Sequence, residues 1–374
     1  MTVTIFLLKT LRIIDLESSY RTYLSKERGG KDSENIIQII KISGIILIVF
    51  QIILAFFIFP LIYFNFLKDK IYFHHFFPSV WAAIFHSVAA TNNAGFDILG
   101  KNSLINYSHH YLFCSLLLLG SLVGGMGFPV IYEMFLYFKK KISSQKHFFS
   151  TYFKICILGT LVISLIGFLS ILFIEYWYSF KETNQYFFRK IGFFNSFWEI
   201  FFSTLSTRTS GFSIIYSENF HPLSLVIQTI LMFIGVCPSS TGGGVKVPSL
   251  IISFLGLKNF IQEKKHLIIF NKLISNKSQL FFLFSTLSSL TLIVVISTII
   301  SFDSDLTFFE SFFNITSCYS CVGLSLGKKL IDYPPFGKLL IVITVLIGQL
   351  GVGSILNFKK SLSEDSIGII KEDL

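Results

Sequence analysis

The chain has 374 residues, of which 52% are hydrophobic and only 14% are charged, and its formal net charge is +10. Mean hydropathy is +0.68, which leaves too little polar surface for a soluble protein of this size. Nucleic-acid binding is not indicated, because Lys and Arg gather in loops between apolar runs, as expected of cytoplasmic loops in a membrane protein. The composition therefore predicts an all-α polytopic membrane protein.

The apolar runs are long enough for six membrane spans, predicted at 42–64, 111–138, 152–174, 223–257, 280–302 and 337–358. The apolar residues 1–8 are too short for a span, and basic residues follow them, so no secretory signal peptide is predicted. Alternating the sides of the spans gathers most Lys and Arg on one face, which is predicted to be cytoplasmic. The segments on that face are 9–41, 139–154, 258–277 and the residues after 358.

Three shorter apolar segments, 76–96, 193–212 and 306–324, lie between pairs of spans on the outer side. Each begins with an aromatic, helix-compatible stretch and ends in small polar residues and Gly. This pattern predicts a half-membrane helix followed by extended backbone, which is tolerated at membrane depth only where protein or a water-filled path covers it. An outer surface helix followed by a loop is the alternative.

These segments belong to an internal repeat. The stretches 85–96 and 201–212 align without gaps on Phe, Ser, Thr and Gly-Phe, and a third copy covers 313–324. Their glycines stand at 95, 211 and 323, at intervals of 116 and 112 residues. The sequence thus predicts three helix–pore-loop–helix repeats around a pseudo-symmetric central pore. The predicted divisions are 1–41, a remnant of a preceding lining helix plus a connector; repeats at 42–141, 142–265 and 266–360; and a cytoplasmic tail at 361–374.

Loops of this kind can point a ring of backbone carbonyls at the axis and replace the water around an alkali cation. Gly is suited to such a loop because it adopts positive φ and lets backbones approach closely. The loops contain no Asp or Glu, so the carboxylate ring of a divalent-cation channel is not supported. The residues assigned to a potassium filter are Thr91, Asn92, Asn93, Ala94, Gly95, Thr207, Arg208, Thr209, Ser210, Gly211, Tyr319, Ser320, Cys321, Val322 and Gly323. We expect Arg208 to turn away from the axis and pair behind the loop, with Glu199 as a candidate partner.

A run of helix breakers interrupts the predicted span 223–257. Pro followed by Ser, Ser, Thr and three Gly cannot continue a helix. The run predicts a flexible loop at 237–246 that plugs the pore and moves aside, and an ordinary helix kink is the alternative. The absence of a Gly-x-x-x-x-Gly-Lys-Ser/Thr pattern after a strand argues against a phosphate-binding loop. The gating residues are Pro238, Ser239, Ser240, Thr241, Gly242, Gly243, Gly244 and Lys246.

Enzymatic chemistry is not indicated. Cys318-x-x-Cys321 is a lone pair without the second pair of a zinc site or the βαβ context of a redox motif. His86 and Ser203 lie near the first and second loops, and the sequence offers neither an evident Asp partner. We therefore expect both to be buried structural residues.

The motifs together resemble the Trk/Ktr/HKT superfamily of potassium transporters, most closely its KtrB/TrkH-type membrane subunits. The resemblance rests on 92–96, 206–212, 309–310 with 322–325, the Gly-Gly-Met-Gly-Phe-Pro run at 124–129, which resembles the start of a lining helix, and 234–246, which resembles an intramembrane gating loop. It implies the ion-translocating subunit of a bacterial inner-membrane uptake system. It further implies K⁺ as the transported ion, Na⁺ as a coupling or activating ion, a cytosolic nucleotide-binding regulatory subunit of KtrA/TrkA type, and a homodimer.

The chain departs from the family pattern in three ways. Only three of the family's four pore loops are found, and one period before Gly95 falls ahead of Met1. Gln349 stands where the last lining helix of the family usually carries Arg, which removes a positive charge from the cavity. Ser320 and Cys321 lie in the third loop of this chain, which resembles the fourth loop of the family, and they replace the Gly-Thr that is usual there. A non-conducting remnant or scaffold that binds a partner is therefore the alternative function.

Overall fold

The computed structural model describes residues 36–64, 75–99, 103–144, 148–181, 186–208, 210–264, 267–270, 272–327 and 333–352. Most of these residues are helical. Of the predicted remnant and connector at 1–41, only 36–41 are described, and they form the first turns of a helix. The predicted tail at 361–374 lies outside the described residues.

Three helices are individually long and apolar enough to cross a membrane: α3 (Ile36–Tyr63), α7 (Thr151–Lys181) and α11 (Asn276–Asp303). They have 28, 31 and 28 residues, more than the roughly 20 that a bilayer core requires. The start of α11 is fixed by Ser275, whose side chain accepts a hydrogen bond from the amide of Ser278. The first, third and fifth predicted spans are thus confirmed as long apolar helices.

The second predicted span is not one straight helix. α5 (Tyr111–Gly125) and α6 (Phe128–Ile142) meet at an angle of 98°. The turn is made by Gly127, whose φ of 80° favours glycine, and Pro129 then stands in the first turn of α6. The run at 124–129 therefore contains the end of α5, the bend and the first residues of α6, whereas the inner helix α5 itself starts earlier, at Tyr111.

The fourth and sixth predicted spans also differ from single helices of the predicted length. The span at 223–257 is broken, as predicted, into α9 (Pro222–Ile234) and α10 (Val247–Ile261). The final span was predicted to reach 358, but α13 (Pro335–Leu350) ends where Gly351 adopts a φ of 78°. Residues 353–374 lie outside the described part of the chain.

The three predicted half-membrane helices are α4 (Phe76–Thr91), α8 (Phe193–Ser206) and α12 (Phe308–Tyr319). Local chemistry sets their starts: α8 follows Gly192 at a φ of 81°, and α12 begins with a capping box between Thr307 and Glu310. The sequence did not predict the antiparallel hairpin of β1 (Leu267–Ile269) and β2 (Lys272–Ile274). Shorter turns lie at Ile105–Tyr107, Tyr186–Lys190 and Ser217–Asn219.

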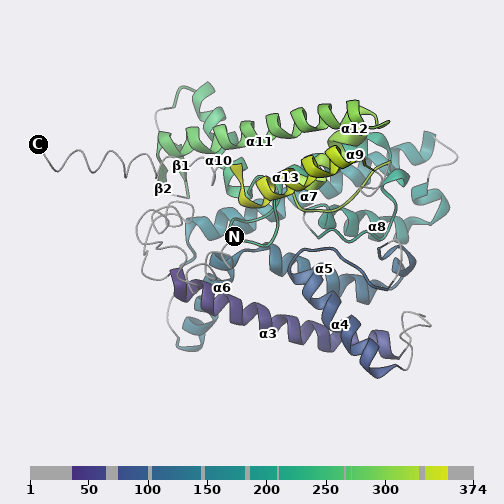
Figure 1. Cartoon of the computed structure of the whole chain (residues 1–374). Helices are drawn as coiled ribbons and strands as arrows, with labels where there is room; N and C mark the ends of the chain where they lie inside the picture. The colour runs from purple at the N-terminus through teal and green to yellow at the C-terminus, as the bar shows by residue number, and fades with distance from the viewer. Residues whose placement is uncertain are drawn as a thin grey trace, which may run out of the picture.

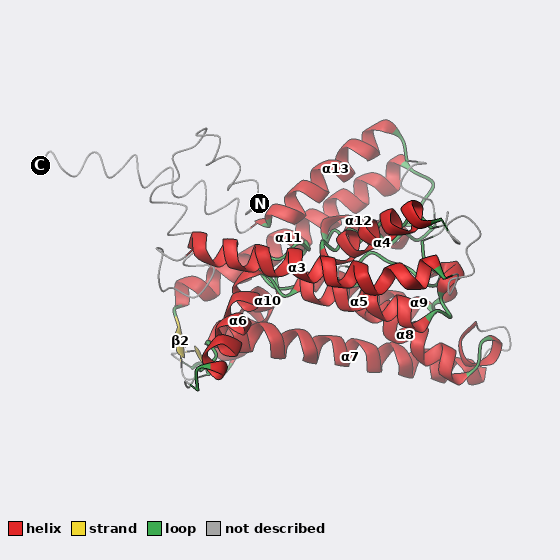
Figure 2. Ribbon diagram, turned by 90° about the horizontal axis from the view of Figure 1, so that it is seen from below, coloured by secondary structure: helices red, strands yellow, loops and turns green. Residues whose placement is uncertain are grey.

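The helices form three successive units, each with an outer helix, a half-membrane helix and an inner helix. They are α3–α4–α5, α7–α8–α9 and α11–α12–α13. In the first and third units the three helices pack against one another, and in the second both α8 and α9 pack on α7. Figure 1 shows α3 and α4 at one edge of the molecule and α11 at the opposite edge, and Figure 2 shows α13 and α7 on opposite sides. Between units, α5 packs on α8 and α9 packs on α12.

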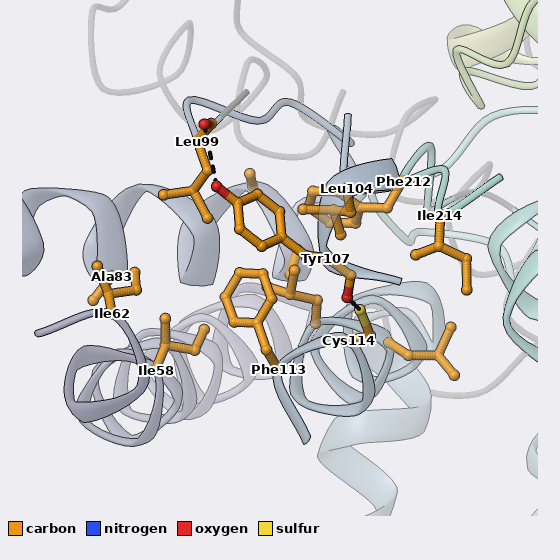
Figure 3. Packing of buried hydrophobic residues seen from close by; sticks show 14 of the residues in the cluster. Ile58, Ile62, Ala83, Leu99, Leu104, Tyr107, Phe113, Cys114, Phe212 and Ile214 are labelled. Carbon is orange, nitrogen blue, oxygen red and sulfur yellow. Dashed lines mark hydrogen bonds between the residues drawn. The ribbon is translucent and has the colours of Figure 1, made fainter. Parts of the chain in front are cut away.

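The first unit and the residues that follow Gly211 share one hydrophobic cluster. Ile58 of α3, Ala83 of α4 and Phe113 of α5 are buried together, and Phe212 and Ile214 of the next unit join them (Figure 3). Tyr107 donates from its hydroxyl to the Leu99 carbonyl (3.4 Å), and Cys114 donates from Sγ to the Tyr107 carbonyl (3.3 Å). In lipid such close packing, rather than removal of water, stabilises helix association.

Candidate functional site

The three half-membrane helices end in loops with related backbone patterns, although in the second loop the amide of Ser210 donates to the Ser206 carbonyl (2.9 Å), one residue closer than in the other two. In the first loop the amide of Ala94 donates to the Ala89 carbonyl (2.9 Å). In the third, the amide of Val322 makes the equivalent bond to the Ser317 carbonyl (2.9 Å). Positive φ then recurs at matching positions, at Asn93 (51°) and Cys321 (55°), and at glycines 95, 211 and 323 (66°, 75° and 89°). Thr209, the matching residue of the second loop, lies outside the described residues.

The loops lie edge to edge in the order first, second, third. A Cβ added to Gly95 would lie 2.6 Å from the Cα of Gly211, and one added to Gly211 would lie 2.3 Å from the carbonyl oxygen of Val322. Real Cβ atoms do not approach backbone so closely, so both junctions require glycine. Residues more than a hundred positions apart in sequence thus form one continuous backbone surface.

Side chains of the filter segments bond to the surrounding helices. Thr91 accepts a hydrogen bond from the side-chain amide of Gln51 on α3 (2.7 Å), and the hydroxyls of Ser210 and Ser121 on α5 are 2.8 Å apart. The Tyr319 hydroxyl donates to Ser289 on α11 (2.7 Å). These three side chains are therefore bonded to the surrounding helices, and the neighbouring backbone carbonyls are polar atoms that the loops can offer to an ion.

The third loop has an open edge. A Cβ added to Gly323 would meet no atom of the described residues within 4 Å, in contrast to a Cβ on Gly95 or Gly211. The half-membrane helix α4 is exposed in a corresponding way: Ile84 is 45% exposed, whereas Ile200, the matching residue of α8, is fully buried. The exposed α4 face consists of Phe77, Trp81, Ile84 and Val88.

The difference follows from how units meet. An inner helix covers each of the other half-membrane helices, α5 covering α8 and α9 covering α12. Among the described elements no inner helix packs in this way on the exposed face of α4, and α13 packs chiefly on its own α11 and α12. The described residues therefore form three sides of a ring, open between Gly323 and α4.

The loop at 237–246 lies against the pore-helix ends of the filter segments. The amide of Gly243 donates to the Ser320 carbonyl (3.2 Å), and a Cβ on Gly243 would lie 2.9 Å from the Tyr319 carbonyl oxygen. On the opposite side, the amide group of Asn93 lies 2.8 Å from the Thr241 hydroxyl. The loop thus contacts both the first and the third filter segments.

The same loop is fastened to the bend between α5 and α6. The amide of Phe128 donates to the Ser239 carbonyl (3.1 Å), and the amide of Cys237 donates to the Gly125 carbonyl (3.3 Å). Lys246 donates from Nζ to the carbonyls of Gly242 and Gly243 (2.5 and 3.3 Å). The bend that the sequence did not predict therefore makes room for this loop and holds it.

Arg208 is turned behind its filter segment, as expected, but its partner is not Glu199. Its Nε and Nη2 both donate to the Gly235 carbonyl (3.0 and 2.6 Å), and Nη1 donates to the Ser164 hydroxyl (3.3 Å). One carboxylate oxygen of Glu199 is buried without a hydrogen-bond partner among the described residues. A charge pair seemed natural from sequence, but the end of α9 supplies a carbonyl in its place.

Three other residues singled out in the sequence are His86, Gln349 and Ser203. His86 is buried and lies 2.8 Å from Asp97, so the expectation that it has no Asp partner was wrong. Asp97 comes two residues after Gly95, so its nearness to the loop was a signal that sequence reasoning missed. Gln349 lies exposed near the end of α13. Ser203 is buried in α8.

Comparison with known proteins identifies the family. The sequence model of the TrkH family, described as cation transport protein, matches residues 1–368. An uncharacterized cation transporter of Mycoplasma pneumoniae is 29% identical over 78% of this chain and 58% of its own length. Ktr system potassium uptake protein B of Vibrio alginolyticus is 28% identical over 72% of this chain and 56% of its own length. The chain thus spans less than two thirds of these curated relatives.

The fold has a solved counterpart. The potassium transporter TrkH from Vibrio parahaemolyticus superposes with a TM-score of 0.66 at 17% identity, covering 90% of this chain and 68% of the other. At that identity the likeness shows the fold alone. Because the family match extends over nearly the whole sequence, this multi-pass membrane protein belongs to the TrkH family of cation transport proteins.

Proposed function

We propose that the chain is the ion-translocating subunit of a potassium-uptake system, in which backbone carbonyls of 91–95, 207–211 and 319–323 replace water around K⁺. The observation that carries the proposal is the edge-to-edge contact of the loops through Gly95, Gly211 and Val322. Carbonyl oxygens suit an alkali cation, and the three segments contain no Asp or Glu. The names of the Ktr relatives agree with K⁺ as the ion.

The loop at 237–246 is the proposed gate. It is built of small, flexible residues, and it contacts the pore-helix ends of two filter segments through Thr241 and Gly243. An ion leaving the filter toward α10 would meet this loop. Transport through the pore would then require the loop to move, and a simple helix kink would not need contacts with two other units.

A three-sided ring would expose a polar filter to lipid, which is costly. We therefore propose that a further helix–pore-loop–helix unit closes the side between Gly323 and α4. The exposed apolar residues Trp81 and Ile84 suit an inner helix packed as α5 is on α8. A non-conducting scaffold is the second candidate, and the same open side favours it if no such unit is supplied.

From the family resemblance we further propose residence in the bacterial inner membrane with the basic loops cytoplasmic, homodimerisation, and a cytosolic nucleotide-binding regulatory subunit. Na⁺ is proposed as a coupling or activating ion on the same ground.

Rubidium uptake in bacteria that lack their own potassium systems tests the proposal. The chain is expressed with the candidate regulator, beside a Gly211→Ser variant whose side chain would overlap the Val322 carbonyl. Uptake by the unmodified chain that the variant abolishes supports a working filter. No uptake from a well-inserted chain, even with a fourth unit co-expressed, would support the scaffold.

A further inference from the structure

One position breaks the likeness between the three filter loops. Three residues before each filter glycine stand Asn92, Arg208 and Ser320. Asn92 bonds back to the Val88 carbonyl of its own helix (3.0 Å), and the Ser320 hydroxyl is buried without a hydrogen-bond partner among the described residues. Only the second loop has a cation here, and in the second unit the 237–246 loop lies between α9 and α10.

The contacts of Arg208 are those of a buried anchor. The side chain is 3% exposed, and it gives two hydrogen bonds to one acceptor, the Gly235 carbonyl. Gly235 follows the last residue of α9, where helix carbonyls lack partners and favour a cation. Among the described residues no carboxylate lies within 4.0 Å of Arg208. The guanidinium is thus committed to the end of α9 by charge-assisted bonds.

Gly235 is the neck of the 237–246 loop. Two hydrogen bonds join the segment that enters the loop to the segment that leaves it. The amide of Val245 donates to the Phe233 carbonyl (3.0 Å), and the amide of Val247 donates to the Val236 carbonyl (3.2 Å). A Cβ on Gly235 would lie 2.4 Å from the Gly243 carbonyl oxygen, so the segments on the two sides of the loop are in close backbone contact. Bonds that fix Gly235 therefore also restrict movement of the whole 237–246 loop.

The bond between Arg208 and Gly235 is one of three contacts that join the loop region to the three filter segments. The tip of the loop touches the first filter segment through Thr241 and Asn93, and the third through Gly243 and Ser320. Arg208 ties the second filter segment to the neck, and it supplies the only charged side chain in these three links. Movement of the loop would have to stretch or break bonds to every described filter segment.

We propose that Arg208 is a positioning residue that couples the second filter segment to the 237–246 loop. While its bonds to Gly235 hold, the loop stays seated against the pore-helix ends. When they break, the loop is released and the second segment loses its rear anchor. The inference rests on the proposed function only in taking the loop as the gate.

A native thiol reports loop release without any transport assay. Cys237 lies in the loop and is 2% exposed, whereas Cys114 is fully buried in the cluster of the first unit. The purified chain in nanodiscs is reacted with N-ethylmaleimide, and labelling of each cysteine is followed by peptide mass spectrometry. Arg208→Met removes the bonds at similar volume, Arg208→Lys retains the charge and one donor group, and Ser164→Ala removes only the outer contact.

We expect Cys237 of Arg208→Met to label about tenfold faster, the order of effect expected when a charge-assisted hydrogen bond stops opposing local opening. Arg208→Lys should fall between, and Ser164→Ala should match the unmodified chain. Protection of Cys237 in folded Arg208→Met overturns the inference. Equal acceleration of Cys114 also overturns it, because Arg208 would then stabilise the protein as a whole.

Rubidium uptake by the same variants tests whether release of the loop changes transport. Arg208→Met should raise uptake without the regulator and lower the preference for Rb⁺ over Na⁺, with partial rescue by Lys. Unchanged uptake and preference in Arg208→Met would contradict the coupling. If the unmodified chain transports nothing, the proposed function fails, while the thiol result still decides whether Arg208 holds the loop.

Discussion

The two junctions between neighbouring loops differ from the open side of the ring in how closely the backbones approach each other. At the junctions, a Cβ on Gly95 or Gly211 would overlap backbone of the next loop, whereas the matching atom on Gly323 meets nothing. The half-membrane helices agree, since Ile200 at a filled junction is buried and Ile84 at the open side is not. The comparison shows that equivalent residues keep their conformation and lose only their neighbours.

The largest effect is expected from paired glycine substitutions. Gly211→Ala adds overlap with the Val322 carbonyl to the backbone strain of a positive φ, which alone costs about 1–2 kcal/mol. Gly323→Ala carries the strain without the overlap. In the isolated chain, Gly211→Ala should lower the apparent Tm by much more than Gly323→Ala. Equal decreases in apparent Tm for the two variants of the isolated chain would mean that Gly323 already has a neighbour. When a fourth unit is added, the decreases for Gly323→Ala and Gly211→Ala should become equal.

The second pair is on the half-membrane helices. Ile200→Ala opens a cavity in a packed site and should destabilise the chain by about 2–5 kcal/mol. Ile84→Ala, at the exposed α4 face, should change stability by no more than about 0.5 kcal/mol. Denaturant titration in detergent compares the two. A costly Ile84→Ala would show that this face is covered.

A smaller effect is expected from a substitution at the contact between the 237–246 loop and the third filter segment. In Gly243→Ala the new methyl would overlap Tyr319 and Ser320 and push the loop from the third segment. Rubidium uptake without the regulator should rise, while Gly44→Ala, which meets no atom within 4 Å, should behave as the unmodified chain. Unaltered uptake in Gly243→Ala would argue that the loop does not obstruct the path.

The smallest effect should come from Gln349→Arg. Gln349 is exposed on α13, so the added charge need not disturb packing. The sequence predicts that position 349 faces the pore, and a positive charge there should reduce inward cation current in a voltage-dependent manner. Current–voltage curves of the completed protein compare the two side chains, and superimposable curves would remove Gln349 from the gating account.

Much of the fold could be predicted because membrane spans and helix breakers have local signatures. The long helices followed from hydropathy, and the recurrence at Gly95, Gly211 and Gly323 followed from spacing. The bend at Gly127 could not be predicted, since its apolar flanks satisfy a span template whether or not the chain turns. What favours the bend is the distant Ser239, which bonds Phe128.

The site shows the same limit. That Arg208 turns behind its loop followed from the cost of a cation at a cation filter, but its partner is a backbone carbonyl, which has no sequence signature. The residues proposed as the gate were chosen for their composition, whereas the contacts of Thr241 and Gly243 depend on how three units meet. Local chemistry identifies such residues, and long-range packing selects their partners.

Anomalous scattering from crystals grown in thallium, a K⁺ analogue, tests the central claim most directly. The account predicts peaks on the axis shared by 91–95, 207–211 and 319–323, within coordination distance of backbone carbonyls, and their loss in Gly211→Ser. Peaks found only elsewhere, or peaks that survive that substitution, would contradict a carbonyl filter built from these loops.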